Sequence, residues 1–146
     1  MNKPLRATPI VPSLDCARIL PGYDFADAYA IPAPVGIDAM SATQLAFSRG
    51  PRWIKALMAT RNRLGAVAGL KPAPASGFPV IRQSPDEVLL GFDDRHLDFR
   101  VAVTVSQGQA MVTTVVRCHN LWGRAYLRAV MPFHRMIAPR MLAGIA

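Results

Sequence analysis

Apolar and polar residues alternate along two neighbouring segments in the last third of the chain, 95–106 and 109–120. A period of two places successive side chains on opposite faces of a strand, so both segments are predicted to be β-strands with one buried face. Gln107 and Gly108 separate them and can form a two-residue hairpin turn, because glycine accepts the positive φ that such a turn requires. The pattern therefore predicts a long β-hairpin.

A two-residue turn also determines which residues of the hairpin face each other. It sets Phe99 opposite Val116, two apolar residues, and Asp98 opposite Arg117, an acid and a base. Matched pairs of this kind stabilise an antiparallel ladder, and a slip of one residue would move every side chain to the other face. We therefore expect this register.

The segment after the hairpin follows the 3.6-residue period of an amphipathic helix. Its predicted apolar stripe contains Trp122, Ala125, Tyr126, Ala129, Val130, Phe133, Met136 and Ile137. Arg124, Arg128 and Arg135 lie on the opposite side. Pro132 and Pro139 each remove a backbone hydrogen bond and bend the helix, which would let it wrap a twisted sheet.

The earlier part of the chain predicts shorter elements. These are a strand over 23–31, a helix Ala39–Ser48 with Asp38 as N-cap, a helix that begins at Pro51, and strands over 78–82 and 87–92. A two-residue turn at Asp93 and Asp94 would place Glu87 opposite Arg100.

Together these elements predict one α+β domain over residues 22–146, preceded by an extended, proline-rich arm over 1–21 with at most a helical turn at 14–20. In this domain a curved antiparallel sheet of about five strands grips a long C-terminal helix, and two shorter helices follow the first strand.

The net charge of +8 is unevenly distributed. All nine acidic residues fall within 15–38 and 86–98, so the segments 39–85 and 99–146 contain none. The basic residues between Arg49 and Lys71, and those of the last helix, therefore form basic surfaces. Such surfaces favour an anionic ligand, an acidic partner protein or an anionic lipid surface, although arginines also serve simply to solvate helices.

The sequence does not indicate a membrane-spanning, secreted, disulfide-rich, metal-binding or nucleic-acid-binding protein. No apolar run approaches the ~18 residues of a membrane span, and no apolar segment of a signal peptide follows Lys3 and Arg6. Cys16 and Cys118 are too few for a disulfide framework and lack metal-ligand spacing. A reducing cytoplasm and no bound metal are therefore expected. Nucleic acid is not an expected partner, because the basic stretch lacks interleaved aromatic residues.

Four stretches resemble a known family: Asp24–Ala30 (DFADAYA), Pro51–Leu57 (PRWIKAL), Asp93–Arg100 (DDRHLDFR) and Thr113–Phe133 (TTVVRCHNLWGRAYLRAVMPF). From Pro21 onward the chain resembles a bacterial family catalogued only as a domain of unknown function. Its members occur alone or behind a nicotinamide-dinucleotide-binding domain. This chain has no glycine-rich dinucleotide fingerprint, so no cofactor is expected.

The element order is also similar to that of the helix-grip superfamily of START and polyketide-cyclase-like proteins. Those proteins hold apolar ligands between the sheet and the last helix. In this chain four predicted strands follow the helices, where six are usual. The resemblance implies a ligand-binding fold and no particular reaction.

One set of polar residues could take part in chemistry. His96, Asp98, Arg117 and His119 would share one face of the hairpin, as an acid–base pair, an incomplete metal site or ordinary cross-strand pairs. His134 is interpreted as a helix-flank histidine bonded to a carbonyl. Neither feature identifies an enzyme or a catalytic residue.

The expected function is binding of a small apolar or amphipathic, and potentially anionic, ligand between the sheet and the last helix. The predicted ligand-binding residues are Trp53, Phe99, Val101, Thr114, Val116, Trp122, Tyr126 and Phe133. One alternative is an interaction module that presents basic helices to an acidic partner or a membrane surface. Another is a cyclase- or isomerase-like enzyme in the same cavity, and a third is that the apolar stripe only fills a core.

Overall fold

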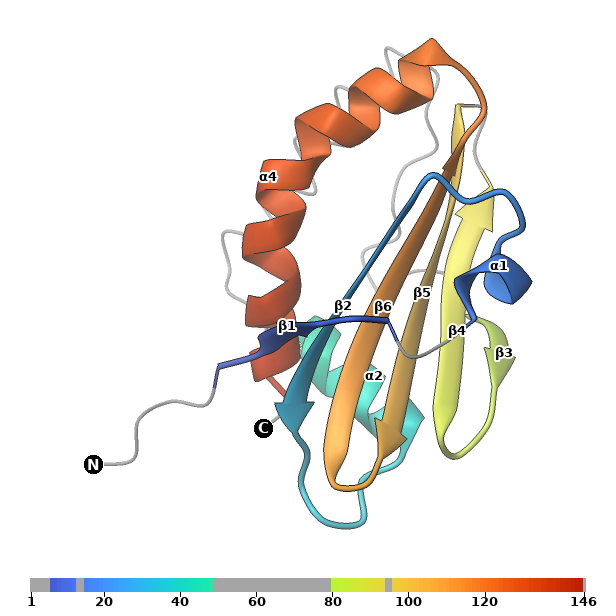
Figure 1. Cartoon of the computed structure of the whole chain (residues 1–146). Helices are drawn as coiled ribbons and strands as arrows, with labels where there is room; N and C mark the ends of the chain where they lie inside the picture. The colour runs from blue at the N-terminus through green and yellow to red at the C-terminus, as the bar shows by residue number, and fades with distance from the viewer. Residues whose placement is uncertain (1–5, 13–14, 49–79, 94–95, 146) are drawn as a thin grey trace.

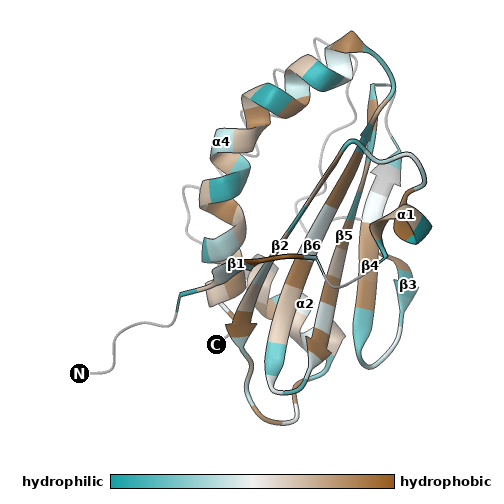
Figure 2. Ribbon diagram, viewed as in Figure 1, coloured by the Kyte–Doolittle hydropathy of each residue, from teal (hydrophilic) through white to brown (hydrophobic). Residues whose placement is uncertain are grey.

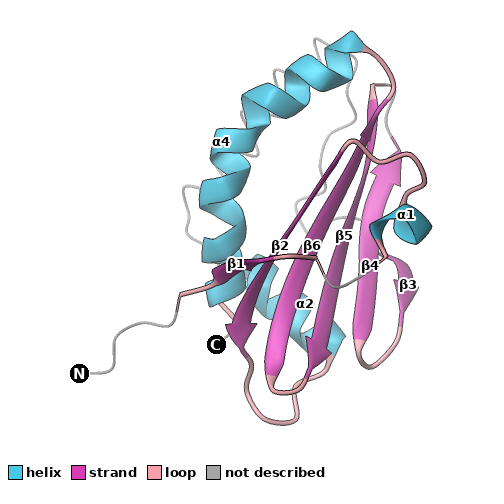
Figure 3. Ribbon diagram, viewed as in Figure 1, coloured by secondary structure: helices cyan, strands magenta, loops and turns pink. Residues whose placement is uncertain are grey.

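The computed structural model describes residues 6–12, 15–48, 80–93 and 96–145 (Figure 1). In chain order its elements are β1 Thr8–Ile10, α1 Cys16–Ile19, β2 Phe25–Pro32, α2 Ala39–Ser48, β3 Val80–Gln83, β4 Glu87–Asp93, β5 Leu97–Ser106, β6 Gln109–Cys118 and α4 Leu121–Ala143. The described strands form one antiparallel six-stranded sheet in the order β1-β2-β6-β5-β4-β3 (Figure 3). The fold is therefore α+β, as predicted.

The predicted hairpin of β5 and β6 is confirmed. Phe99 pairs with Val116, and the ladder continues without a shift from one end to the other. Gln107 has φ 51° and Gly108 has φ 75°. Two successive positive φ values define the turn whose twist suits a two-residue hairpin.

The predicted register between β4 and β5 is wrong. Glu87 pairs with Thr104 rather than with Arg100, because β4 continues to Asp93, which pairs with Asp98. The connection is thus longer than the two residues assumed. Alternation alone could not detect this difference, since a shift of four residues leaves every side chain on the same face.

The sheet has six strands where about five were expected, and the additional strand comes from the N-terminal arm. β1 pairs with β2 along the edge of the sheet, with Thr8 opposite Ala30. β1 contains only three residues, one of which is Pro9, so its sequence has no recognisable strand pattern. Proline is tolerated there because β1 is an edge strand. The arm then forms α1, within the segment where a helical turn was expected, and the Asp15 side chain caps it.

The helices lie on the two faces of the sheet. We call the face that contacts α2 and α4 the inner face and the face that contacts α1 the outer face (Figure 1). Asp38 caps the start of α2 as predicted, because its carboxylate accepts a hydrogen bond of 2.7 Å from the backbone N–H of Ser41. The predicted helix that begins at Pro51 and the basic residues between Arg49 and Lys71 lie outside the described residues.

α4 begins immediately after β6. The Asn120 side chain accepts a hydrogen bond of 2.9 Å from the backbone N–H of Gly123 and so caps the helix. Both Pro132 and Pro139 lie inside the helix, and α4 curves along the sheet (Figure 1). None of the described helices combines the length and apolar character needed to cross a membrane.

Candidate functional site

The inner face of the sheet is tightly packed at one end. There Ile31, Val103 and Ala110 of the sheet are buried in one cluster. The cluster also contains Leu142, in the last turn of α4, and Ile145, just after the helix. Residues of α2 complete this cluster. This end of the inner face is a filled core.

The other end of the inner face is packed less completely. Its half-buried residues are Phe25 and Asp27 on β2, Phe99 and Val101 on β5, and Thr114 on β6. Val116 of β6, which lies between Phe25 and Phe99, is buried, with 6% of its surface exposed. These six residues are adjacent across three strands, because Phe25 pairs with Val116 and Asp27 pairs with Thr114. We call them the inner-face site.

Four of the predicted ligand-binding residues belong to the inner-face site. They are Phe99, Val101, Thr114 and Val116. Tyr126 of α4 is half-buried. Trp53 lies outside the described residues. The structure therefore brings the predicted sheet residues together, and ligand contact by any of them stays a prediction.

The predicted orientation of Trp122 and Phe133 is wrong. Trp122 is 75% exposed and Phe133 is 48% exposed, so neither packs against the sheet. The sheet-facing positions are displaced by one residue and include Gly123 and His134. Figure 2 shows apolar and polar segments alternating along the exposed length of α4.

The start of α4 explains this rotation. A Cβ atom on Gly123 would clash with the carbonyl oxygen of His96, so the helix approaches β5 with its glycine side. This close approach fixes the rotation of the helix about its axis. The apolar pattern could not reveal it, because a glycine and a histidine occupy positions that the pattern assigns to the polar flank.

His134 lies at the centre of the sheet-facing side of α4 and reaches the inner-face site. Its Nε2 atom lies 2.9 Å and 3.1 Å from the two carboxylate oxygens of Asp27. Both side chains are about four-fifths buried, with 19% and 22% of their surfaces exposed. The Phe25 ring meets the imidazole edge-on, with ring centroids 6.1 Å apart. The prediction that His134 bonds to a carbonyl at the helix flank is therefore wrong.

The pair has a defined hydrogen-bonding geometry. An ionised carboxylate only accepts hydrogen bonds, so Nε2 of His134 carries a hydrogen in either charge state of the ring. Nδ1 makes no hydrogen bond with the described residues. Asp27 thus orients an imidazole whose second nitrogen can form a hydrogen bond with a ligand.

Tyr29 lies two residues from Asp27 on the same face of β2. Burial raises the pKa of the Tyr29 phenol, the Asp27 carboxylate raises it further, and the Arg135 guanidinium acts in the opposite direction. The phenol is consequently a neutral hydrogen-bond donor at physiological pH. The inner-face site therefore combines apolar walls with the polar groups of Asp27, Thr114 and His134, and Tyr29 lies between it and the filled core.

The predicted cluster on the hairpin is present, and its members act as structural pairs. The Asp98 carboxylate accepts from Arg117 at 2.6 Å and contacts Nε2 of His119 at 2.8 Å. Burial alone would raise the pKa of Asp98, but the hydrogen bonds from His119 and Arg117 outweigh it and lower the pKa. His96 instead contacts the Asn120 side chain, at 3.1 Å. Asp98 is only 2% exposed, so this network joins β5 to β6 without offering the carboxylate to a ligand.

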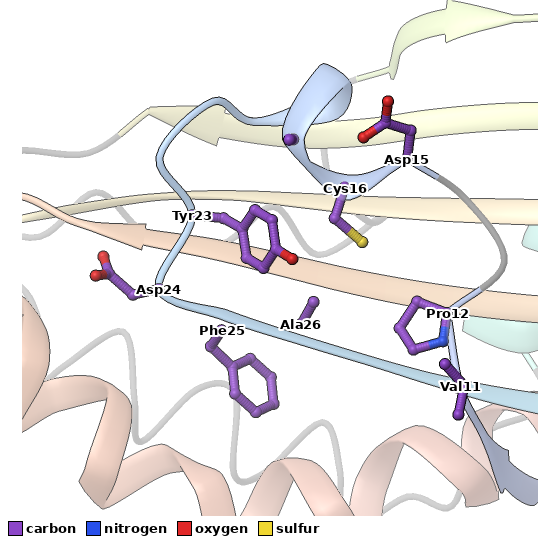
Figure 4. A pocket seen from close by; sticks show the side chains of 9 residues that line it. Val11, Pro12, Asp15, Cys16, Tyr23, Asp24, Phe25 and Ala26 are labelled. Atoms are coloured by element: carbon purple, nitrogen blue, oxygen red, sulfur yellow. The ribbon is translucent and has the colours of Figure 1, made fainter.

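A separate pocket of about 410 Å³ lies beside the start of β2 (Figure 4). Its lining residues are Val11, Pro12, Asp15, Cys16, Ala17, Tyr23, Asp24, Phe25 and Ala26. Burial and the neighbouring Asp15 charge raise the pKa of the Cys16 thiol, and burial likewise raises that of Cys118. Both thiols are therefore poor nucleophiles. Among the described residues, no group of three or more potential ligands is placed to hold a metal ion.

Comparison with known proteins identifies one family. The model of a family described as "Protein of unknown function (DUF2867)" matches residues 19–141. No curated protein and no solved structure matches the chain.

Proposed function

The chain belongs to the DUF2867 family, and we propose that it binds a small amphipathic molecule at the inner-face site, beneath the middle of α4. The observation that supports this proposal most strongly is the contact between His134 and Asp27. A polar pair that faces an otherwise apolar, half-buried surface is the kind of group that orients a ligand in a small-molecule site.

The packing along α4 supports the same proposal. Among the described residues of the helix, only Gly123 near its start and Leu142 near its end are buried. Between them, Val130 and His134 are only half-buried. A helix that is buried at both ends and half-buried between them supports a ligand site beneath its middle.

The proposed ligand has two parts. Phe25, Phe99 and Val101 would contact an apolar ring or chain, and His134 would bond a hydroxyl, carbonyl or carboxylate group. The element order remains similar to that of the helix-grip superfamily, and we propose a comparable use of the space between sheet and helix.

Native mass spectrometry of the purified full chain tests this function. The expected result is a small molecule that co-purifies with the wild type and is lost from the variant His134→Phe. If every preparation is free of small molecules and apolar probes do not bind, the proposal is wrong.

The second candidate is an interaction module, and the exposed side of α4 favours it. Leu121, Trp122, Phe133 and Met136 are exposed there by 81%, 75%, 48% and 39%. α4 also contains four exposed arginines and no acidic residue. Binding of an acidic partner to this side should be weakened by Trp122→Ala and unaffected by His134→Phe.

A further inference from the structure

Three arginines line one groove between the N-terminal segment and the C-terminal half of α4. The groove has a volume of about 460 Å³. Arg6 comes from the segment before β1, and Arg135 and Arg140 come from α4. Figure 1 shows the start of β1 beside this part of the helix. The groove is distinct from the inner-face site, and a ligand could bind in it whether or not the inner-face site has the function proposed above.

The groove is strongly positive. Its other lining residues are Ala7, Met136, Pro139 and Ala143, so the described residues of the lining contribute no side-chain carboxylate. Neither Arg6 nor Arg135 forms an ion pair with the described residues. An anion bound in the groove would therefore be attracted by the guanidinium groups of Arg6 and Arg135.

Simple explanations account for some arginines of α4 and not for this group. Arg124 lies 3.4 Å from the Asp24 carboxylate and forms a surface ion pair. Arg140 is in the last turn, where a cation is favourable next to the negative end of the helix dipole. Arg135 is more than a turn earlier, and Arg6 belongs to another segment. The convergence of two segments on the groove is therefore not explained by helix stability.

We infer that this groove binds the phosphate group of a small phosphomonoester. A guanidinium group presents a planar fork of N–H donors that matches phosphate oxygens, which makes arginine the usual residue for phosphate recognition. A phosphate monoester carries close to two negative charges at neutral pH, which complements the two guanidinium groups of Arg6 and Arg135 better than a single carboxylate does. The apolar floor of Met136 and Pro139 would contact the organic part of the ester.

Titration of the full chain with phenyl phosphate, followed by calorimetry at constant ionic strength, tests this site. The expected result is saturable binding that is weakened at least about tenfold, or about 1.4 kcal/mol, by Arg6→Gln and by Arg135→Gln. Arg128→Gln is the matched control, because Arg128 is an exposed arginine of the same helix that does not line the groove. It removes the same charge and should leave the affinity unchanged.

Two further titrations separate the sources of the anion. Inorganic phosphate should bind the same site more weakly, and acetate more weakly still. Vesicles of phosphatidylcholine with phosphatidylglycerol report attraction to a headgroup layer instead. The inference is overturned if phenyl phosphate shows no saturable binding, if Arg128→Gln weakens binding as much as Arg135→Gln, or if only the vesicles bind.

Discussion

The imidazole of His134, in the middle of α4, lies 2.9 Å from a carboxylate oxygen of Asp27 on β2. The two residues are 107 positions apart in the sequence, and their contact connects the C-terminal helix to the inner face of the sheet. It is also the polar centre of the proposed ligand site.

Replacing Asp27 with asparagine should lower the free energy of unfolding by about 1–2 kcal/mol. The change keeps the shape of the side chain and removes the charge that the half-buried imidazole contacts. Urea unfolding measures the loss. Glu87→Gln is the control, because Glu87 pairs with Arg82 at the surface, at 3.4 Å, and such pairs contribute no more than about 0.5–1 kcal/mol. Equal losses for the two variants would contradict a structural role for the His134–Asp27 contact.

Asp98 should make the stability depend on pH in the acid range. Its pKa is lower in the folded chain than the ordinary aspartate value of about 3.9. The unfolded chain therefore takes up the proton first as the pH falls. The stabilisation is fully present above the ordinary value and is lost as the pH falls through the folded pKa.

Asp98→Asn should consequently lower stability near neutral pH by about 2 kcal/mol, and this difference from the wild type should shrink as the pH falls below about 4. Thermal unfolding between pH 7 and pH 2 gives the two curves. Asp86→Asn, at an exposed turn position, serves as the control. Parallel curves for wild type and Asp98→Asn would show that protonation of the Asp98 carboxylate does not change the stability of the folded chain.

Gly123→Ala should destabilise the chain by about 2 kcal/mol, although alanine favours an isolated helix by about 1 kcal/mol. The added Cβ would clash with the carbonyl oxygen of His96, which accepts a hydrogen bond of 2.9 Å from the backbone N–H of His119 and cannot move aside freely. The reverse change at an exposed site, Ala125→Gly, should cost only the helix propensity, about 1 kcal/mol. A Gly123→Ala variant more stable than the wild type would show that the close approach is wrong.

Phe133→Ala should cost less than about 1 kcal/mol, because nearly half of this side chain is already exposed. Val103→Ala removes a smaller side chain that is 1% exposed and should cost about 2 kcal/mol or more. Urea unfolding of both variants decides the orientation of α4. A larger loss for Phe133→Ala would support the apolar stripe that the sequence predicts.

The hairpin and the helix differ in how far the sequence predicts them. The β5–β6 register was predictable because a glycine turn and the Asp98–Arg117 pair specify the same alignment. The rotation of α4 was not, because it depends on the contact of Gly123 with the carbonyl of His96, just before β5. A helical period identifies an amphipathic helix, and only tertiary contact selects which side is buried.

The polar part of the inner-face site was also beyond sequence reasoning. Asp27 alternates with alanines in β2 and looks like a solvent-facing residue. His134 has apolar neighbours on α4 and no sequence motif around it. The available signal was the alternation of the predicted strand over 23–31, because Asp27 is two residues from both Phe25 and Tyr29 and so shares a face with them.

The most direct test of the proposed ligand site is titration of an apolar fluorescent probe into the wild type and into Thr114→Phe. Thr114 lies at the centre of the inner-face site, between Asp27 and Val101. A phenyl ring there would occupy the proposed ligand volume. Thr8→Phe makes the same substitution at an exposed position of β1 and serves as the control. Near-UV circular dichroism confirms that each variant is folded.

We expect saturable binding by the wild type and by Thr8→Phe, and loss of that binding in folded Thr114→Phe. Wild-type chain that binds no probe, or Thr114→Phe that binds as tightly as the wild type, would contradict a ligand site between the sheet and α4.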